Sequence, residues 1–66
     1  MTAEDFGRRV AEIRQERGIN QHELSRRLGK DRSYINKLES GDVNVTLGVI
    51  FTLCEILQVR PGELFE

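Results

Sequence analysis

The side chains with the most evident binding chemistry lie in one short segment near the middle of the chain. This segment holds a guanidinium, a hydroxyl, an amide and an ammonium group, on Arg32, Ser33, Asn36 and Lys37. Residues three or four apart share one face of a helix, so these groups would project together from a helical segment. Arginine and asparagine can each make two hydrogen bonds to the edge of a nucleobase. The segment is therefore a candidate surface for nucleic-acid recognition.

The rest of the chain offers little that could catalyse a reaction. It has no paired carboxylates, no nucleophile beside a base and no phosphate-binding loop. Cys54 is the only cysteine and His22 the only histidine, so the chain lacks both an internal disulfide and the ligand spacing of a zinc site. We interpret Cys54 as a core residue and His22 as an exposed one. The sequence predicts a binding protein, not an enzyme, with no metal and no cofactor.

Charge is distributed unevenly along the chain. The net charge is −1, yet nine of the ten basic residues and four of the eleven acidic ones lie between Arg8 and Lys37. This stretch therefore carries +5, which suits a surface that faces phosphates. No segment resembles a membrane helix or a signal peptide, so we expect a cytoplasmic protein without a membrane partner.

Hydrophobic spacing predicts five helices in one all-α domain over residues 1–66. Phe6, Val10 and Ile13, for example, recur at the interval of a helical stripe. We expect helices at residues 3–17, 21–28, 32–39 and 47–57, and a fifth that begins at Pro61. The expected N-caps are Thr2, Asn20 (with Glu23 completing a capping box), Asp31 and Thr46, and the expected C-terminal stops are Gly18, Gly29 and Gly41.

The second and third of these helices have the spacing of a helix-turn-helix over residues 21–40. Ser25 is small enough for a close crossing, and Gly29 lets the backbone reverse with a positive φ. In a helix-turn-helix the second helix lies in the major groove of duplex DNA. We therefore expect residues 32–39 to be a recognition helix.

Three stretches resemble the XRE family of phage Cro and repressor-type regulators. They are ERGINQHELSRRLG (16–29), SYINKLESG (33–41) and LQVRPGELF (57–65). The resemblance spans residues 6–65 and implies a compact five-helix domain like that of the lambda repressor, which binds double-stranded DNA. The longer stretch SYINKLESGDVNVTL (33–47) resembles the controller proteins of restriction-modification systems.

The resemblance also implies roles for individual residues. The positions that read base edges are Arg32, Ser33, Asn36 and Lys37, and those that contact the DNA backbone are Asn20, Gln21, Lys30, Tyr34 and Asn44. Arg14 and Glu39 match an ion pair that joins the first and third helices. Lys30 and Asn44 depart from the family pattern, which often has an apolar residue after the turn glycine and a basic residue in the loop after the recognition helix. We interpret Arg26 and Arg27 as solvated surface.

The fourth helix carries two apolar stripes. We predict that one stripe faces the core, formed by Leu47, Ile50, Cys54 and Leu57 with Phe51 beside it. A single helix in a small domain seldom buries a second stripe. We therefore predict a two-fold dimer interface of Val49, Leu53, Ile56, Leu64 and Phe65. The alternative is that the fifth segment folds back and covers this stripe.

These features favour a homodimeric transcriptional regulator that binds a pseudo-palindromic operator. A second hypothesis is an antitoxin-type DNA-binding module whose apolar fourth helix docks on a partner protein. A third is a helical adaptor that binds only protein.

Overall fold

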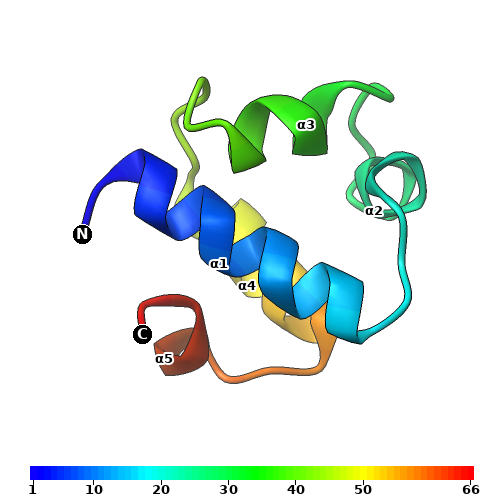
Figure 1. The fold of residues 1–66 in the computed structure, drawn as a ribbon. Helices are drawn as coiled ribbons and strands as arrows, with labels where there is room; N and C mark the ends of the chain where they lie inside the picture. The colour runs from blue at the N-terminus through cyan, green and yellow to red at the C-terminus, as the bar shows by residue number, and fades with distance from the viewer.

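The structure, a computed structural model, describes all 66 residues and contains only helices (Figure 1). The helices are α1 (Ala3–Glu16), α2 (Gln21–Arg27), α3 (Tyr34–Glu39), α4 (Leu47–Leu57) and α5 (Pro61–Leu64). In the view of Figure 1, α1 crosses in front of α4, with α3 above it and α5 below it. None of these helices has the length and hydrophobicity needed to span a bilayer. The predicted all-α fold with five helices is confirmed.

The helix ends follow local capping chemistry. Thr2 and Asp5 form a reciprocal capping box, in which each side chain accepts the other residue's backbone N–H at 3.0 Å. The Asn20 side chain caps α2 by accepting the backbone N–H of Glu23 at 2.8 Å. The predicted capping box at α2 is wrong, however, because the Glu23 carboxylate binds two arginines of its own helix. Gly29 ends the turn after α2 with φ 74°, as its position predicted.

Ten apolar side chains, contributed by all five helices, form a single core. The predicted stripes of α1 and α3 point into it, and Cys54 is also buried there. Burial raises the pKa of the Cys54 thiol. This environment suits a packing role for the cysteine.

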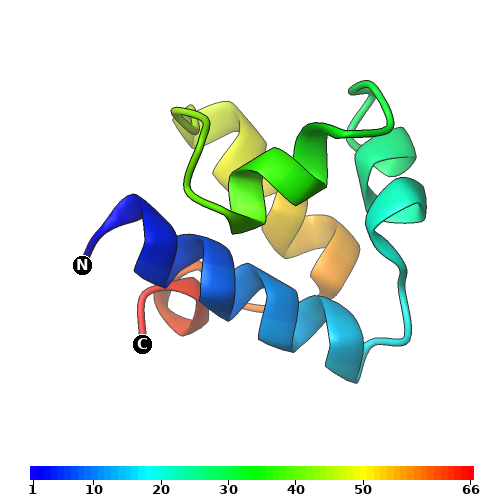
Figure 2. The same ribbon diagram turned by 45° about the horizontal axis from the view of Figure 1, so that its top comes forward.

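Helices α1 and α3 cross at close range and lie side by side in Figures 1 and 2. A methyl group on Gly7 would place its carbon 2.5 Å from the carbonyl oxygens of both Leu38 and Glu39. Atoms cannot approach this closely, so only glycine allows α1 to pass over the end of α3. The crossing offsets the cost of about 1 kcal/mol that a glycine imposes inside a helix.

The predicted dimer stripe is wrong in part, because α5 folds back onto α1 and α4. Leu53 and Leu64 are fully buried in the core of one chain, so neither can contact a second chain. Val49 and Ile56 are half-buried and pack against the same core. The alternative arrangement, in which the fifth segment covers this stripe, is the one the structure adopts.

The predicted core stripe of α4 is also wrong at its N-terminal end. Leu47 is 70% exposed and Phe51 is 52% exposed, whereas Cys54 and Leu57 are buried as expected. Phe65 of the C-terminal tail is 51% exposed, although its ring contacts that of Phe6 at a centroid distance of 5.5 Å. Both faces of α4 are apolar, so hydrophobic periodicity did not distinguish the face that α5 covers from the face left outside.

Two arginines, one within α1 and one at its C-cap, bind the C-terminal half of the chain. The Arg9 guanidinium donates to the carbonyl oxygen of Glu63 at 2.8 Å, and Arg17 donates to that of Leu57 at 2.8 Å. Each satisfies a carbonyl at a helix C-terminus, where no backbone N–H is available. These two positive charges therefore serve the fold, although they fall in the basic stretch of the sequence.

Gly7→Ala tests the close crossing of α1 and α3. We expect a loss of about 2 kcal/mol in the free energy of unfolding, because the added carbon forces the two helices apart. Gly48→Ala is the matched control in α4, where the nearest atom would be Thr46 Oγ1 at 3.8 Å. That control should gain up to about 1 kcal/mol from helix propensity. Urea unfolding measures both, and a Gly7→Ala variant as stable as the control would contradict the tight crossing.

Candidate nucleic-acid interface

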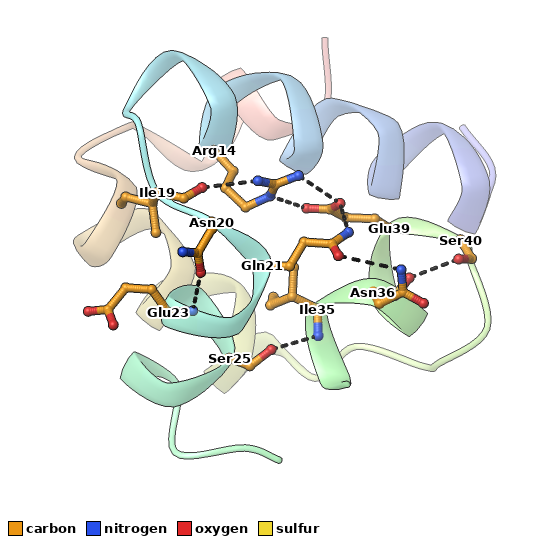
Figure 3. Close-up of polar contacts among 10 residues, drawn as sticks. All are labelled: Arg14, Ile19, Asn20, Gln21, Glu23, Ser25, Ile35, Asn36, Glu39 and Ser40. Carbon is orange, nitrogen blue, oxygen red and sulfur yellow. Dashed lines mark hydrogen bonds and ion pairs between the residues drawn. The ribbon is translucent and has the colours of Figure 1, made fainter. Parts of the chain in front are cut away.

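A buried hydroxyl joins α2 to the start of α3. Ser25 is fully buried in the middle of α2, and its Oγ accepts the backbone N–H of Ile35 at 3.0 Å (Figure 3). Ile35 lies in the first turn of α3, where backbone N–H groups lack a partner within the helix. Ser25 thus acts as a cap supplied by another helix. The sequence indicated only that Ser25 is small, so this role was missed.

The segment before α3 differs from the prediction. We expected the helix to begin at Arg32 with Asp31 as its N-cap, but α3 begins at Tyr34, and residues 32–33 form a turn. The Asp31 carboxylate accepts the hydroxyl of Ser33 at 2.7 Å and its backbone N–H at 2.9 Å. These bonds hold the pKa of Asp31 below its usual value. Aspartate thus stabilises a local turn in competition with the helix, which explains the later start.

An ion pair between Arg14 and Glu39 connects α1 to the end of α3, as the resemblance implied. Arg14 Nε lies 2.7 Å from one carboxylate oxygen of Glu39, and its Nη2 lies 3.2 Å from the other. The two side chains are only 10% and 9% exposed. Arg14 Nη1 also donates to the carbonyl oxygen of Ile19 at 3.0 Å, which includes the loop before α2 in the same network.

Gln21 extends this network toward the outer surface of α3. Its Nε2 donates to Glu39 Oε1 at 2.8 Å, and its Oε1 lies 3.5 Å from Nδ2 of Asn36 (Figure 3). The sequence placed Gln21 at the DNA backbone and Asn36 at the bases, but gave no sign that the two side chains touch. Gln21 Nε2 makes one hydrogen bond within the chain, which leaves its second hydrogen without a partner there.

The polar side chains around α3 lie at the surface. Arg32, Asn36 and Lys37 are exposed, and Ser33 is half-buried against Asp31. Arg32 and Lys37 form no salt bridge within the chain, whereas Arg26 and Arg27 both pair with Glu23. These two arginines lower the pKa of Glu23 to about 2. The uncompensated positive charge of the motif is therefore concentrated at the start and outer face of α3.

The other predicted backbone contacts come from the loops around α2 and α3 and from the first residue of α3. The Nζ of Lys30 lies 5.4 Å from the ring centre of Tyr34, a cation–π distance that groups the two side chains. Asn20 Oδ1 is occupied as the cap of α2, which leaves the amide N–H groups of that side chain free to donate. Asn44 is exposed in the loop between α3 and α4.

Ser25→Ala tests the interhelical cap. It leaves the buried N–H of Ile35 without a partner, and we expect a loss of about 1–3 kcal/mol in the free energy of unfolding. Ser40→Ala is the matched control, because Ser40 is exposed and its hydroxyl donates only to a carbonyl of its own helix. That variant should change stability by less than about 0.5 kcal/mol. Equal stability of the two variants in thermal or urea unfolding would contradict the cap.

Comparison with known proteins agrees with this arrangement. Residues 10–64 match the model of the helix-turn-helix family. A relative from Sinorhizobium fredii, named uncharacterized HTH-type transcriptional regulator y4dJ, is 34% identical over 58 residues. The match covers 88% of this chain and 75% of the relative.

Several solved structures share the fold over nearly the whole chain. The restriction-modification controller protein C.AhdI from Aeromonas hydrophila is 40% identical with a TM-score of 0.88, covering 96% of this chain and 91% of that one. The hypothetical transcription factor NHTF from Neisseria is 26% identical with a TM-score of 0.90, covering 100% and 76%. The clp gene regulator ClgR from Corynebacterium glutamicum is 20% identical with a TM-score of 0.91, covering 98% and 69%, and shows the fold alone.

Since the family match runs from the middle of α1 to the end of α5, this chain belongs to the XRE-type helix-turn-helix family of DNA-binding transcriptional regulators.

Proposed function

We propose that the protein binds a specific duplex DNA sequence by placing α3 in the major groove. The observation that carries this proposal is the surface formed by Arg32, Asn36 and Lys37, which are exposed and free of carboxylate partners within the chain. Asn36 and Lys37 lie on α3 and Arg32 in the turn before it, and α3 is anchored by Ser25 at its start and by Arg14 at its end. A rigid helix with unpaired basic groups on its outer face and in the turn before it suits recognition of base edges between two rows of phosphates.

The exposed groups divide into base readers and backbone contacts. Arg32 suits the O6 and N7 acceptors of guanine, and Lys37 and Ser33 can add single donors to neighbouring bases. Lys30, Tyr34, Asn20, Gln21 and Asn44 flank these groups and suit phosphates, which fix the position of the domain on the duplex.

A homodimer would double the sequence that the short α3 can read. Two copies related by a two-fold axis place their recognition helices about 34 Å apart, one turn of DNA, and bind a pseudo-palindromic operator. We propose that the dimer forms through the exposed apolar side chains Leu47, Phe51 and Phe65, in place of the buried residues that the sequence suggested. Leu47 and Phe51 are four residues apart on α4 and so share one face.

The similarity to C.AhdI supports a role as a controller protein of the same kind. The chain covers 91% of that controller's length at 40% identity. A protein of this design would act by occupying its operator, and the dimer equilibrium would make occupancy depend steeply on protein concentration.

Arg32→Ala and Lys30→Ala distinguish base readout from backbone contact. We expect Arg32→Ala to weaken binding to the preferred operator by about 1–3 kcal/mol and to remove the base preference at one position. Lys30→Ala should weaken binding to all duplexes alike. It should also make the slope of the logarithm of the binding constant against the logarithm of salt concentration shallower by about 1, the contribution of one phosphate contact. Duplexes selected from a random pool, then titrated at several salt concentrations, measure both effects. Identical behaviour of the two variants across operator mutants would contradict the division.

Phe51→Glu tests the proposed dimer. The wild-type protein should sediment at twice the chain mass of 7.6 kDa, and Phe51→Glu at the monomer mass, because a charge on the exposed face opposes association. Gln15→Glu adds the same charge at an exposed position of α1 and should leave the dimer intact. A wild-type monomer that becomes dimeric only with a different protein would favour the antitoxin-type hypothesis instead.

A further inference from the structure

The hydrogen bonds from Glu39 through Gln21 to Asn36 have only one consistent direction. A carboxylate accepts hydrogen bonds and cannot donate them, so Gln21 must turn its NH₂ group toward Glu39. The amide oxygen of Gln21 then faces Asn36, and only the NH₂ group of Asn36 can be its partner. The observed distances follow this order, at 2.8 Å from Gln21 Nε2 to Glu39 and 3.5 Å from Asn36 Nδ2 to Gln21 Oε1. The charge of Glu39 thereby selects one of the two amide orientations at each step.

Arg14 keeps the origin of this chain of bonds fixed. It contacts both carboxylate oxygens of Glu39, and the oxygen at 3.2 Å from its Nη2 is the one that also accepts from Gln21. The guanidinium favours the ionised carboxylate, the form that has no proton to donate to Gln21. The orientation of an exposed amide on α3 is thus determined by a buried ion pair between α1 and α3.

We propose that this chain of hydrogen bonds from Glu39 through Gln21 to Asn36, here called the relay, makes Asn36 an adenine-reading residue, with Glu39 and Gln21 as positioning residues. One N–H of Asn36 is directed to Gln21, and the oxygen and the other N–H are left on the exposed edge of the amide. An adenine in the major groove presents the matching pair, an N6 donor and an N7 acceptor. The inference rests on the proposed function, because it requires α3 to lie in the major groove.

The other bases fit this edge less well. Guanine presents two acceptors, so its O6 would face the amide oxygen of Asn36. Cytosine offers one donor, and thymine offers one acceptor and a methyl group. A freely rotating amide could turn over to suit another arrangement of donors and acceptors, but turning over would break the bond to Gln21. The relay therefore gives specificity by removing one of two orientations.

Binding of paired duplexes tests the proposal. Wild-type protein selects duplexes from a random pool, and the preferred adenine at each position is then replaced by the other three bases in competition assays. We expect the wild type to prefer adenine about tenfold or more at one position, and Asn36→Ala to lose that preference. Gln21→Ala should reduce the same preference by about 2- to 10-fold, because Asn36 is no longer oriented.

The Gln21 variants separate positioning from a simple phosphate contact. Loss of a phosphate contact weakens binding to every duplex alike, so a preference unchanged in Gln21→Ala would overturn the relay. Gln15→Ala removes an exposed amide of α1 that lies outside both the network and the proposed interface, so it is the matched control and should leave the preference unchanged. Gln21→Met keeps the side-chain length without polar atoms, and should behave like Gln21→Ala if the amide is responsible.

The outcomes also separate this proposal from the proposed function. If the wild-type protein binds no duplex above the level of random DNA, the proposed function fails. If it binds a specific duplex but Asn36→Ala keeps every adenine preference, only the relay is overturned. Matching thermal unfolding curves for wild type, Asn36→Ala and Gln21→Ala exclude misfolding as the cause.

Discussion

The carboxylate of Glu39 is the point on which the geometry of the recognition surface depends. Glu39 is the last residue of α3, and its carboxylate pairs with Arg14 of α1 and accepts a hydrogen bond from the side-chain amide of Gln21 in α2. One buried anion therefore fixes three helices relative to one another. Removing two charges from water costs several kcal/mol per ion, so such a pair adds little net stability compared with apolar residues of the same size. Its benefit here is orientation, because only one arrangement of the three helices satisfies all of its hydrogen bonds.

This fixed anchor matters because α3 is too short to be stable alone. It has six residues, and isolated helices shorter than about 12–15 residues are marginal in water. Contacts with the rest of the fold supply the stability that the helix propensity of six residues does not. Ile35 and Leu38 are buried in the core, Ser25 caps the first turn, and Gly7 allows α1 to pass directly over the last turn. The exposed residues of α3 are therefore held by contacts on its buried side, and they are free to vary without loss of the fold.

Sequence reasoning located the helices because their signals are local. Caps such as Thr2 and Asn20 and the turn at Gly29 depend on residues a few positions apart, and all three are found where expected. The pair of Arg14 and Glu39 came from the family resemblance, since nothing local joins residues so distant. The face of α4 was predicted wrongly for a physical reason. Both of its sides are apolar, and which of Leu53 and Phe51 is buried depends on the side that the rest of the fold covers, including α5, which follows α4 after a short loop and packs back onto it.

The same distinction between local and distant partners explains how an acidic chain can present a positive surface. A count of charges along the sequence treats every arginine alike, yet Arg9, Arg14 and Arg17 form hydrogen bonds within the fold, and the two arginines of α2 share Glu23. The basic groups around α3 have no such partners. A phosphate backbone approaching this domain would therefore experience the local charge of that surface and not the net charge of −1, because charges separated by more than about 10 Å are screened by salt. What sets the sign of the interface is where the carboxylates are paired: Glu39 of α3 pairs with Arg14 on the buried side, and Glu23 pairs with the two arginines of α2, so neither neutralises Arg32 or Lys37.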